Sequence, residues 1–186
     1  MQLRLLILDF DGTLADTRQA NARAYVAALK EFGYEMTEEE YLKRYFGVRC
    51  PDFLRSIGIL EEGLIDRIRR RKIELYPTFF SSLKLNEPLW NFAQDFRRQG
   101  GKVWIVSTGQ ADNLRNAMHH LALTSGIDGI LSANDVENHK PAPDAFLLAM
   151  EREGVTPAET LIFEDSTVGI EAARRSGAAY VVVNLG

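Results

Sequence analysis

Two aspartates separated by one residue follow a short apolar run near the start of the chain. The run spans residues 5–8, and Asp9 and Asp11 come directly after it, with Gly12 next. A continuous apolar run of this length predicts a strand buried on both faces, as in a parallel sheet under helices. Two neighbouring carboxylates are costly to bury unless a cation lies between them. A hard divalent cation such as Mg²⁺ is therefore expected, although a lone Asp-x-Asp also suits an exposed acidic turn.

Other polar residues follow the ends of further predicted strands. Ser107 follows the apolar strand predicted at 102–106, and Glu164 and Asp165 end the strand predicted at 160–163. Lys140 precedes a predicted helix in a loop with two prolines. Because ligands bind beyond the carboxyl ends of strands in an open parallel sheet, we expect all these side chains at one edge.

This set of residue types suits a phosphoryl group. Carboxylates supply oxygen ligands for Mg²⁺, and Lys140 adds a positive charge that balances an anion. Ser107 offers a hydroxyl, and the N–H groups of Thr108 and Gly109 are expected to open a helix over about 110–121, which would make an anion site. One remaining carboxylate can then act as a nucleophile.

The elements that must hold these residues alternate between strands and helices. Residues from about 17 to 80 have only helical patterns, between the first strand and the next. Alternation of this kind predicts a parallel sheet covered by helices on both faces. We therefore expect an α/β fold, with a Rossmann-like core formed by 1–16 and 81–186 and an inserted α-helical cap domain at 17–80.

Composition narrows the function classes. The chain has 186 residues and a formal net charge of -4, which argues against nucleic acid as a partner. The one cysteine, Cys50, excludes an internal disulfide and fits a reducing cytoplasm. No apolar stretch approaches the roughly 20 residues of a membrane span. We expect a cytoplasmic enzyme that acts on a small molecule, with no membrane partner; the oligomeric state is left open.

Four motifs in order resemble those of the haloacid dehalogenase-like superfamily, in its branch with a helical cap. The phosphoglycolate phosphatase and β-phosphoglucomutase-like group is the most similar. The resemblance covers nearly the whole chain. The motifs are Asp9-Phe10-Asp11-Gly12-Thr13-Leu14, Ser107 after a strand, Lys140-Pro141-Ala142-Pro143, and Glu164-Asp165-Ser166 with Gly169-Ile170.

The resemblance implies a role for each catalytic residue. Asp9 attacks phosphorus and forms an aspartyl-phosphate. Asp11 protonates the leaving oxygen and later takes a proton from the hydrolytic water. Ser107 bonds to the phosphoryl oxygens, and Lys140 holds Asp9 and neutralises charge. The substrate is expected to be a small-molecule phosphate monoester.

The resemblance also implies a metal site and a cap contact. Asp165 and Glu164 anchor Mg²⁺ together with Asp9 and the main-chain carbonyl of Asp11. Arg49 stands where this family often places a substrate-facing cap loop, and it is expected to meet a carboxylate or a second phosphate. A solvated arginine is the simpler interpretation of the same residue.

Alternative functions remain open from the sequence. A phosphomutase is the closest alternative, but Asn21 stands where the mutases carry a histidine. Asp11 argues against a dehalogenase, because displacement at carbon needs no acid there. A signalling receiver domain shares the residue types but lacks the helical insert, and a non-catalytic phosphate binder needs no complete catalytic set.

Overall fold

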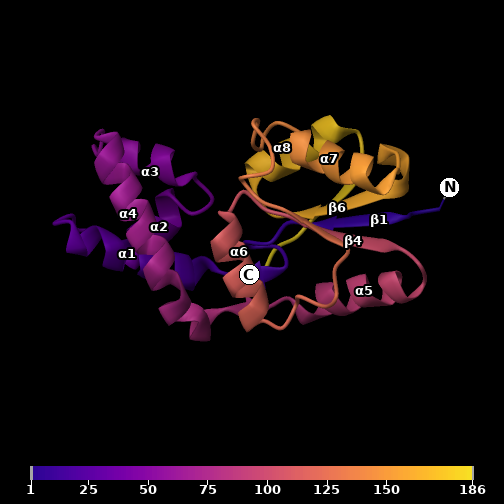
Figure 1. Cartoon of the computed structure of the whole chain (residues 1–186), viewed down its shortest axis with the longest axis horizontal. Coiled ribbons are helices and arrows are strands. Elements are labelled where there is room, and N and C mark those ends of the chain that lie inside the picture. The colour runs from indigo at the N-terminus through magenta and orange to yellow at the C-terminus, as the bar shows by residue number, and fades with distance from the viewer. Residues whose placement is uncertain (1, 186) are drawn as a thin grey trace. The chain divides into compact units, whose positions relative to one another are not determined.

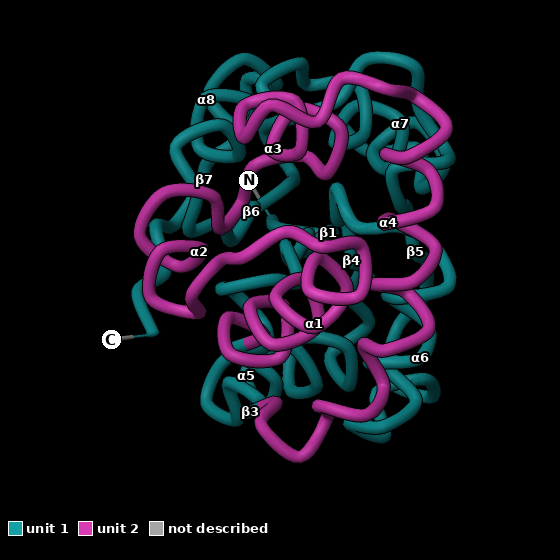
Figure 2. Tube along the Cα trace, turned by 90° about the vertical axis from the view of Figure 1, so that its left-hand side faces the viewer, with its two compact units in different colours: residues 1–16, 84–186 teal, residues 17–83 magenta. Residues whose placement is uncertain are grey.

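The computed structural model describes residues 2–185, which form two compact units (Figure 2). Unit 1 combines the segment up to Asp16 with the segment from Lys84 onward, and unit 2 is the inserted segment Thr17–Leu83. Each unit has its own cluster of buried apolar side chains. The α/β class expected from the sequence is confirmed.

Unit 1 is built on a five-stranded sheet whose paired strands are all parallel. The strand order is β5-β4-β1-β6-β7, which places β1 at the centre. All four residues of β1 are fully buried, which is why its sequence is a continuous apolar run. The strands are β1 (Leu5–Leu8), β4 (Lys102–Val106), β5 (Gly129–Leu131), β6 (Thr160–Glu164) and β7 (Ala179–Val182).

The register of the sheet brings the strand ends together. Leu8, the last residue of β1, pairs with Ile105 of β4 and with Phe163 of β6. Asp9 therefore leaves the sheet beside the ends of both neighbouring strands.

Helices cover both faces of this sheet (Figure 1). Helices α7 and α8 lie on one face, and α5 lies on the opposite face and contacts β4. The bounds are α5 (Glu87–Arg98), α6 (Ala111–His120), α7 (Asp144–Glu153), the 3-10 helix η2 (Pro157–Glu159) and α8 (Thr167–Ser176).

Unit 2 is helical and packs around aromatic rings. The ring of Phe53 lies 5.2 Å from Tyr25, 5.4 Å from Tyr41 and 4.8 Å from Tyr45, measured between centroids. The contacts with Tyr25 and Tyr41 are edge-to-face and the contact with Tyr45 is tilted, and aromatic pairs at these distances are favourable beyond their buried area. The helices are α1 (Arg18–Glu31), α2 (Glu38–Arg44), α3 (Cys50–Ser56), α4 (Glu62–Leu75) and the 3-10 helix η1 (Tyr76–Ser82).

A short antiparallel pair that the sequence did not predict stands at the root of the insert. Strand β2 (Ala15–Asp16) pairs with β3 (Lys84–Leu85), so the chain leaves and re-enters unit 1 at adjacent positions. Two-residue strands carry no periodicity, and their pairing depends on residues about 70 positions apart.

The surface of unit 1 includes an exposed edge strand. Strand β7 ends the sheet order, and Tyr180, Val181 and Val182 are 39%, 41% and 56% exposed.

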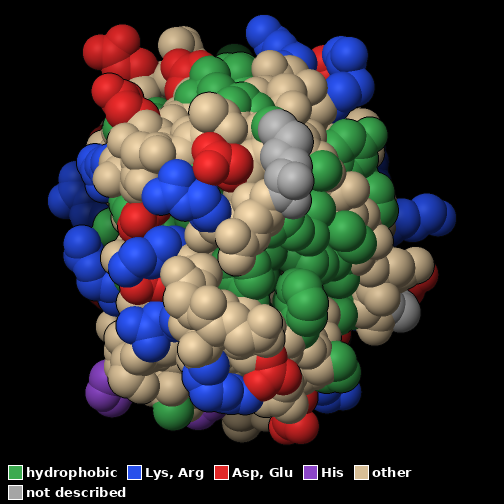
Figure 3. All heavy atoms as spheres, turned by 90° about the vertical axis from the view of Figure 1, so that its right-hand side faces the viewer, with side chains coloured by type: hydrophobic (Ala, Val, Ile, Leu, Met, Phe, Trp, Pro, Cys, Tyr) green, Lys and Arg blue, Asp and Glu red, His purple; other side chains and the backbone are tan. Residues whose placement is uncertain are grey.

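Figure 3 shows one face of the molecule, where hydrophobic side chains gather in one area and charged side chains lie at its margin. Within residues 2–185, no helix has the length and apolar character needed to cross a bilayer.

Candidate active site

The segment after β1 turns sharply and fixes both aspartates. The N–H of Leu14 donates to the carbonyl of Asp9 at 3.2 Å, and the N–H of Gly12 donates to the carbonyl of Ala15 at 2.8 Å. Gly12 has φ of 92°, a conformation that glycine adopts without steric cost. The turn leaves Asp9 buried and Asp11 partly exposed.

Lys140 lies at the centre of the site. Its ammonium donates to Asp9 Oδ1 at 2.6 Å, to Glu164 Oε1 at 2.6 Å and to the main-chain carbonyl of Val106 at 3.1 Å. The Lys140 side chain is 3% exposed, and those of Asp9 and Glu164 are 10% and 0% exposed. The lysine thus joins the ends of β1, β4 and β6 through one buried charge.

Asp165 lies beside Asp9 and Glu164, and Thr13 orients its carboxylate. The hydroxyl of Thr13, which is fully buried, donates to Asp165 Oδ1 at 3.0 Å. Gly12 packs against the same carboxylate, and a β-carbon at position 12 would overlap with it. Gly12 and Thr13 of the first motif therefore position a carboxylate about 150 residues further along the chain.

The Ser107 loop adds neutral donors to the site. Ser107 is buried, and its hydroxyl donates to Asp11 Oδ2 at a long 3.4 Å and accepts from the N–H of Gly109 at 2.9 Å. The expectation that Thr108 and Gly109 open a helix is wrong, because α6 begins at Ala111. They lie in the turn before it, where the Ser107 hydroxyl competes for the Gly109 N–H.

The site has more acidic than basic side chains, and this affects their pKa values. Burial raises the pKa of Asp9 well above its ordinary value, Glu164 raises it further, and Lys140 offsets part of this rise. Burial also raises the pKa of Asp165, against a lowering by the Thr13 hydroxyl. Burial alone would lower the pKa of Lys140, but Asp9 and Glu164 outweigh it and the pKa is raised.

The carboxylates have the composition and spacing of a site for a hard divalent cation. Asp9, Glu164 and Asp165 each offer an oxygen, and these oxygens lie within 4.8 Å of one another. Three carboxylates around one ammonium leave negative charge that such a cation would balance. The donor set therefore fits the metal that the sequence predicted.

One expected site residue lies in the other unit. Arg49 is exposed and forms the N-cap of α3 in unit 2, without a side-chain capping bond. Its role toward substrate stays a prediction.

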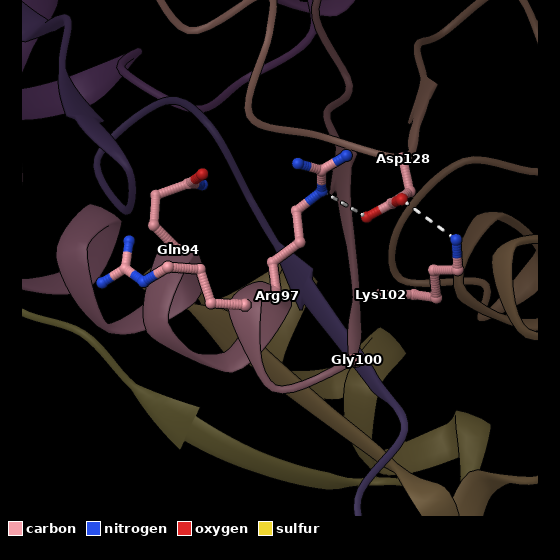
Figure 4. A pocket seen from close by; sticks show the side chains of 7 residues that line it. Gln94, Arg97, Gly100, Lys102 and Asp128 are labelled. Carbon is pink, nitrogen blue, oxygen red and sulfur yellow. Dashed lines mark hydrogen bonds and ion pairs between the residues drawn. The ribbon is translucent and has the colours of Figure 1, made fainter.

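A pocket of about 320 Å³ lies elsewhere in unit 1 (Figure 4). None of the predicted site residues lines it. Asp128 is held there between Arg97 at 3.0 Å and Lys102 at 3.1 Å. These ion pairs join the end of α5 to the start of β4, and we interpret them as structural.

Comparison with known proteins agrees with the fold. The sequence profile of the haloacid dehalogenase-like hydrolases matches residues 6–183. The chain belongs to this family, and the resemblance stated from the motifs is confirmed.

Named relatives extend this result to the class of enzyme. The chain is 30% identical to the fructose-1-phosphate phosphatase YqaB of Escherichia coli, over 97% of this chain and 96% of the relative. It is 30% identical to a phosphorylated carbohydrates phosphatase of Thermotoga maritima, over 94% of this chain and 82% of the relative. The structure of CbbY from Rhodobacter sphaeroides in complex with phosphate superposes with a TM-score of 0.88 at 22% identity, covering 98% and 87% of the two chains. The chain is a phosphatase of the haloacid dehalogenase-like type.

Sequence reasoning gave no role to several residues that shape the site. Thr13 lies inside the first motif, two residues after Asp11. Its place in the motif was the signal that could have pointed to a role in the site. The Val106 carbonyl carries no signal, because every strand ends in a carbonyl. Gly169 belongs to the last motif without a role of its own, whereas it lies in helix α8 against the carboxylate of Glu164.

Proposed function

We propose that the chain hydrolyses the phosphate monoester of a small sugar-like metabolite through an aspartyl-phosphate on Asp9. The observation that carries this proposal is the ammonium of Lys140, which holds Asp9 Oδ1 at 2.6 Å beside a group of carboxylates. A nucleophile fixed by a buried cation is suited to attack on phosphorus, where negative charge must be accommodated.

The reaction has two steps. A carboxylate oxygen of Asp9 forms a bond to phosphorus while the ester P–O bond breaks, and Asp11 gives its proton to the leaving oxygen. Water then attacks phosphorus, the acyl-phosphate P–O bond breaks, and the water gives a proton back to Asp11. Inorganic phosphate and the free alcohol leave, and both aspartates return to their starting states.

The other residues bind and orient the phosphoryl group. The hydroxyl of Ser107 and main-chain N–H groups of the Thr108–Gly109 turn donate to its oxygens, and Lys140 neutralises charge as it moves. Asp9, Asp165 and Glu164, with the carbonyl of Asp11, would hold Mg²⁺, which supplies charge stabilisation at the transferring group when bound. Residues 17–83 are proposed as the cap that selects the substrate, with Arg49 as a contact to its distal end.

The named phosphatases among the relatives guide the choice of substrates. The test is a panel of fructose 1-phosphate, other sugar monophosphates and phosphoglycolate, with Mg²⁺ or with a chelator. We expect release of inorganic phosphate from a subset of the panel and loss of turnover on chelation. Retention of phosphate on the sugar at a new position would instead indicate a mutase.

Asp9→Asn tests the nucleophile. The amide keeps the shape of the side chain but is a poor nucleophile, so we expect kcat to fall by about 10³-fold or more. Asp112→Asn is the matched control, because the Asp112 side chain is 80% exposed and should leave kcat unchanged. Unchanged turnover in Asp9→Asn would rule the mechanism out.

A further inference from the structure

A glycine in helix α8 lies against the carboxylate of Glu164. Gly169 is buried in the first turn of α8, and its N–H donates to the N-cap Ser166 at 3.1 Å. A β-carbon built at position 169 would come within 3.0 Å of Glu164 Cδ and of both carboxylate oxygens, which real β-carbons do not do. Any other residue must therefore displace the carboxylate or the helix.

Both oxygens of the Glu164 carboxylate accept hydrogen bonds. Oε1 accepts from Lys140 at 2.6 Å, and Oε2 accepts from the N–H of Asp165 at 2.9 Å and from the N–H and hydroxyl of Ser166 at 3.0 and 3.1 Å. The side chain is fully buried, so it cannot turn outward. A shift large enough to admit a methyl group would break the contact with Lys140.

Backbone conformation does not explain a glycine at this position. Gly169 lies inside a regular α-helix, where alanine is the more favourable residue. The space it leaves for Glu164 is the remaining explanation.

We propose that Gly169 is a positioning residue: its missing side chain lets Glu164 hold Lys140 against Asp9. This inference rests on the proposed function, in which Lys140 serves the nucleophile. Gly169 touches neither substrate nor reacting atoms and acts only through Glu164.

Gly169→Ala tests this inference. Helix propensity alone predicts a variant at least as stable as the wild type. Displacement of Glu164 predicts instead that kcat falls tenfold or more while KM changes less than threefold. Gly63→Ala is the matched control, because Gly63 also lies inside a helix and its β-carbon would be 3.3 Å from the exposed side chain of Glu61. It should leave kcat as it is, because Gly63 lies far along the chain from Glu164 and its β-carbon would meet only exposed side chains.

A double variant isolates the path through Glu164. Glu164→Ala removes the carboxylate that the methyl group would strike, so Gly169→Ala should change kcat less than twofold in that background. A tenfold loss in the Glu164→Ala background would overturn the proposal. If Gly169→Ala alone does not fold, the double variant should be as stable as Glu164→Ala, and a double variant less stable than Glu164→Ala would also overturn the proposal.

A second readout needs no activity. Amine-reactive labelling of Lys140 in the metal-free enzyme, followed by peptide mass spectrometry, reports how firmly its ammonium is held. We expect Lys140 to be protected in the wild type and in Gly63→Ala and labelled at least tenfold faster in folded Gly169→Ala. Equal protection in all three would contradict the proposal. If the wild type hydrolyses no phosphate monoester but the labelling differs as expected, the proposed function fails and the positioning by Gly169 stands.

Discussion

At the scale of single residues, the site depends on a buried lysine between two carboxylates. Removing one partner of a buried ion pair costs about 3–5 kcal/mol, because a buried charge is left without compensation. Asp9, Lys140 and Glu164 are therefore tied together in stability as well as in the proposed chemistry. Asp165 differs from them, because a neutral hydroxyl orients it.

Thr13→Val should lower the affinity of the proposed site for Mg²⁺ without abolishing binding. Valine keeps the shape of threonine but cannot donate to Asp165 Oδ1, so this carboxylate loses its fixed orientation. Groups that orient a metal ligand typically change metal affinity by about 10- to 100-fold. We expect the Mg²⁺ concentration for half-maximal activity to rise by that factor, with kcat at saturating Mg²⁺ within a few fold. Thr124→Val, at an exposed position, is the control, and an identical Mg²⁺ dependence in Thr13→Val would contradict this role.

At the scale of elements, Asp128 connects α5 to the sheet. Its carboxylate accepts from Arg97, Lys102 and the N–H of Val103 at 3.0, 3.1 and 3.0 Å. Burial would raise its pKa, but the Val103 N–H and the two cations outweigh burial, and the pKa is lowered.

Asp128→Asn should destabilise the protein in a pH-dependent way. Hydrogen bonds to a charged group contribute about 1.5–3 kcal/mol, and asparagine keeps part of them, so we expect a loss of about 1–2 kcal/mol at pH 7. Because the folded-state pKa is depressed, this stabilisation is present above the ordinary value of 3.8 and disappears as the pH falls through the folded-state pKa. Urea unfolding of both forms from pH 7 to pH 3 measures it. A difference that stays constant with pH would show that the charge of Asp128 is not responsible.

Continuous apolar runs were predictable as strands from the sequence, and the two-residue strands β2 and β3 were not. The apolar runs at 5–8, 102–106 and 160–163 form parallel strands whose ends are aligned, so Asp9 and Glu164 could be grouped from the sequence alone. The helix expected over about 110–121 is α6, and its bounds differ by one residue at each end. The turn before it, in which the Ser107 hydroxyl accepts from the N–H of Gly109, was not predicted. The contact between Gly169 and Glu164 depends on packing in three dimensions, which spacing does not reveal.

At the scale of the whole molecule, each unit has a hydrophobic core cluster of its own within residues 2–185. One core cluster of unit 1 lies between the sheet and helices α7 and α8, and that of unit 2 surrounds Phe53. Because the cores are separate, each unit can unfold locally while the other stays folded, as cooperative parts of one chain often do.

Phe53→Ala should loosen unit 2 selectively. Phe53 is fully buried against three tyrosine rings, and truncating a buried phenylalanine typically costs about 3–5 kcal/mol. We expect amides within 17–83 to exchange hydrogen faster, while those of β1 and β4 keep their protection. Hydrogen exchange with mass spectrometry resolves the two sets of peptides. Equal loss of protection in both would mean that the units unfold as one.

The antiparallel pair of β2 and β3 has a consequence for how such a chain can change. Asp16 pairs with Lys84, so the insert departs and returns at partners on adjacent strands, which are typically about 5 Å apart. Any segment whose two ends lie at that spacing could be inserted between the same two positions. Such an insertion would put little strain on the five-stranded sheet. The proposed cap can therefore be exchanged at this junction while Asp9 and Lys140 keep their places in unit 1.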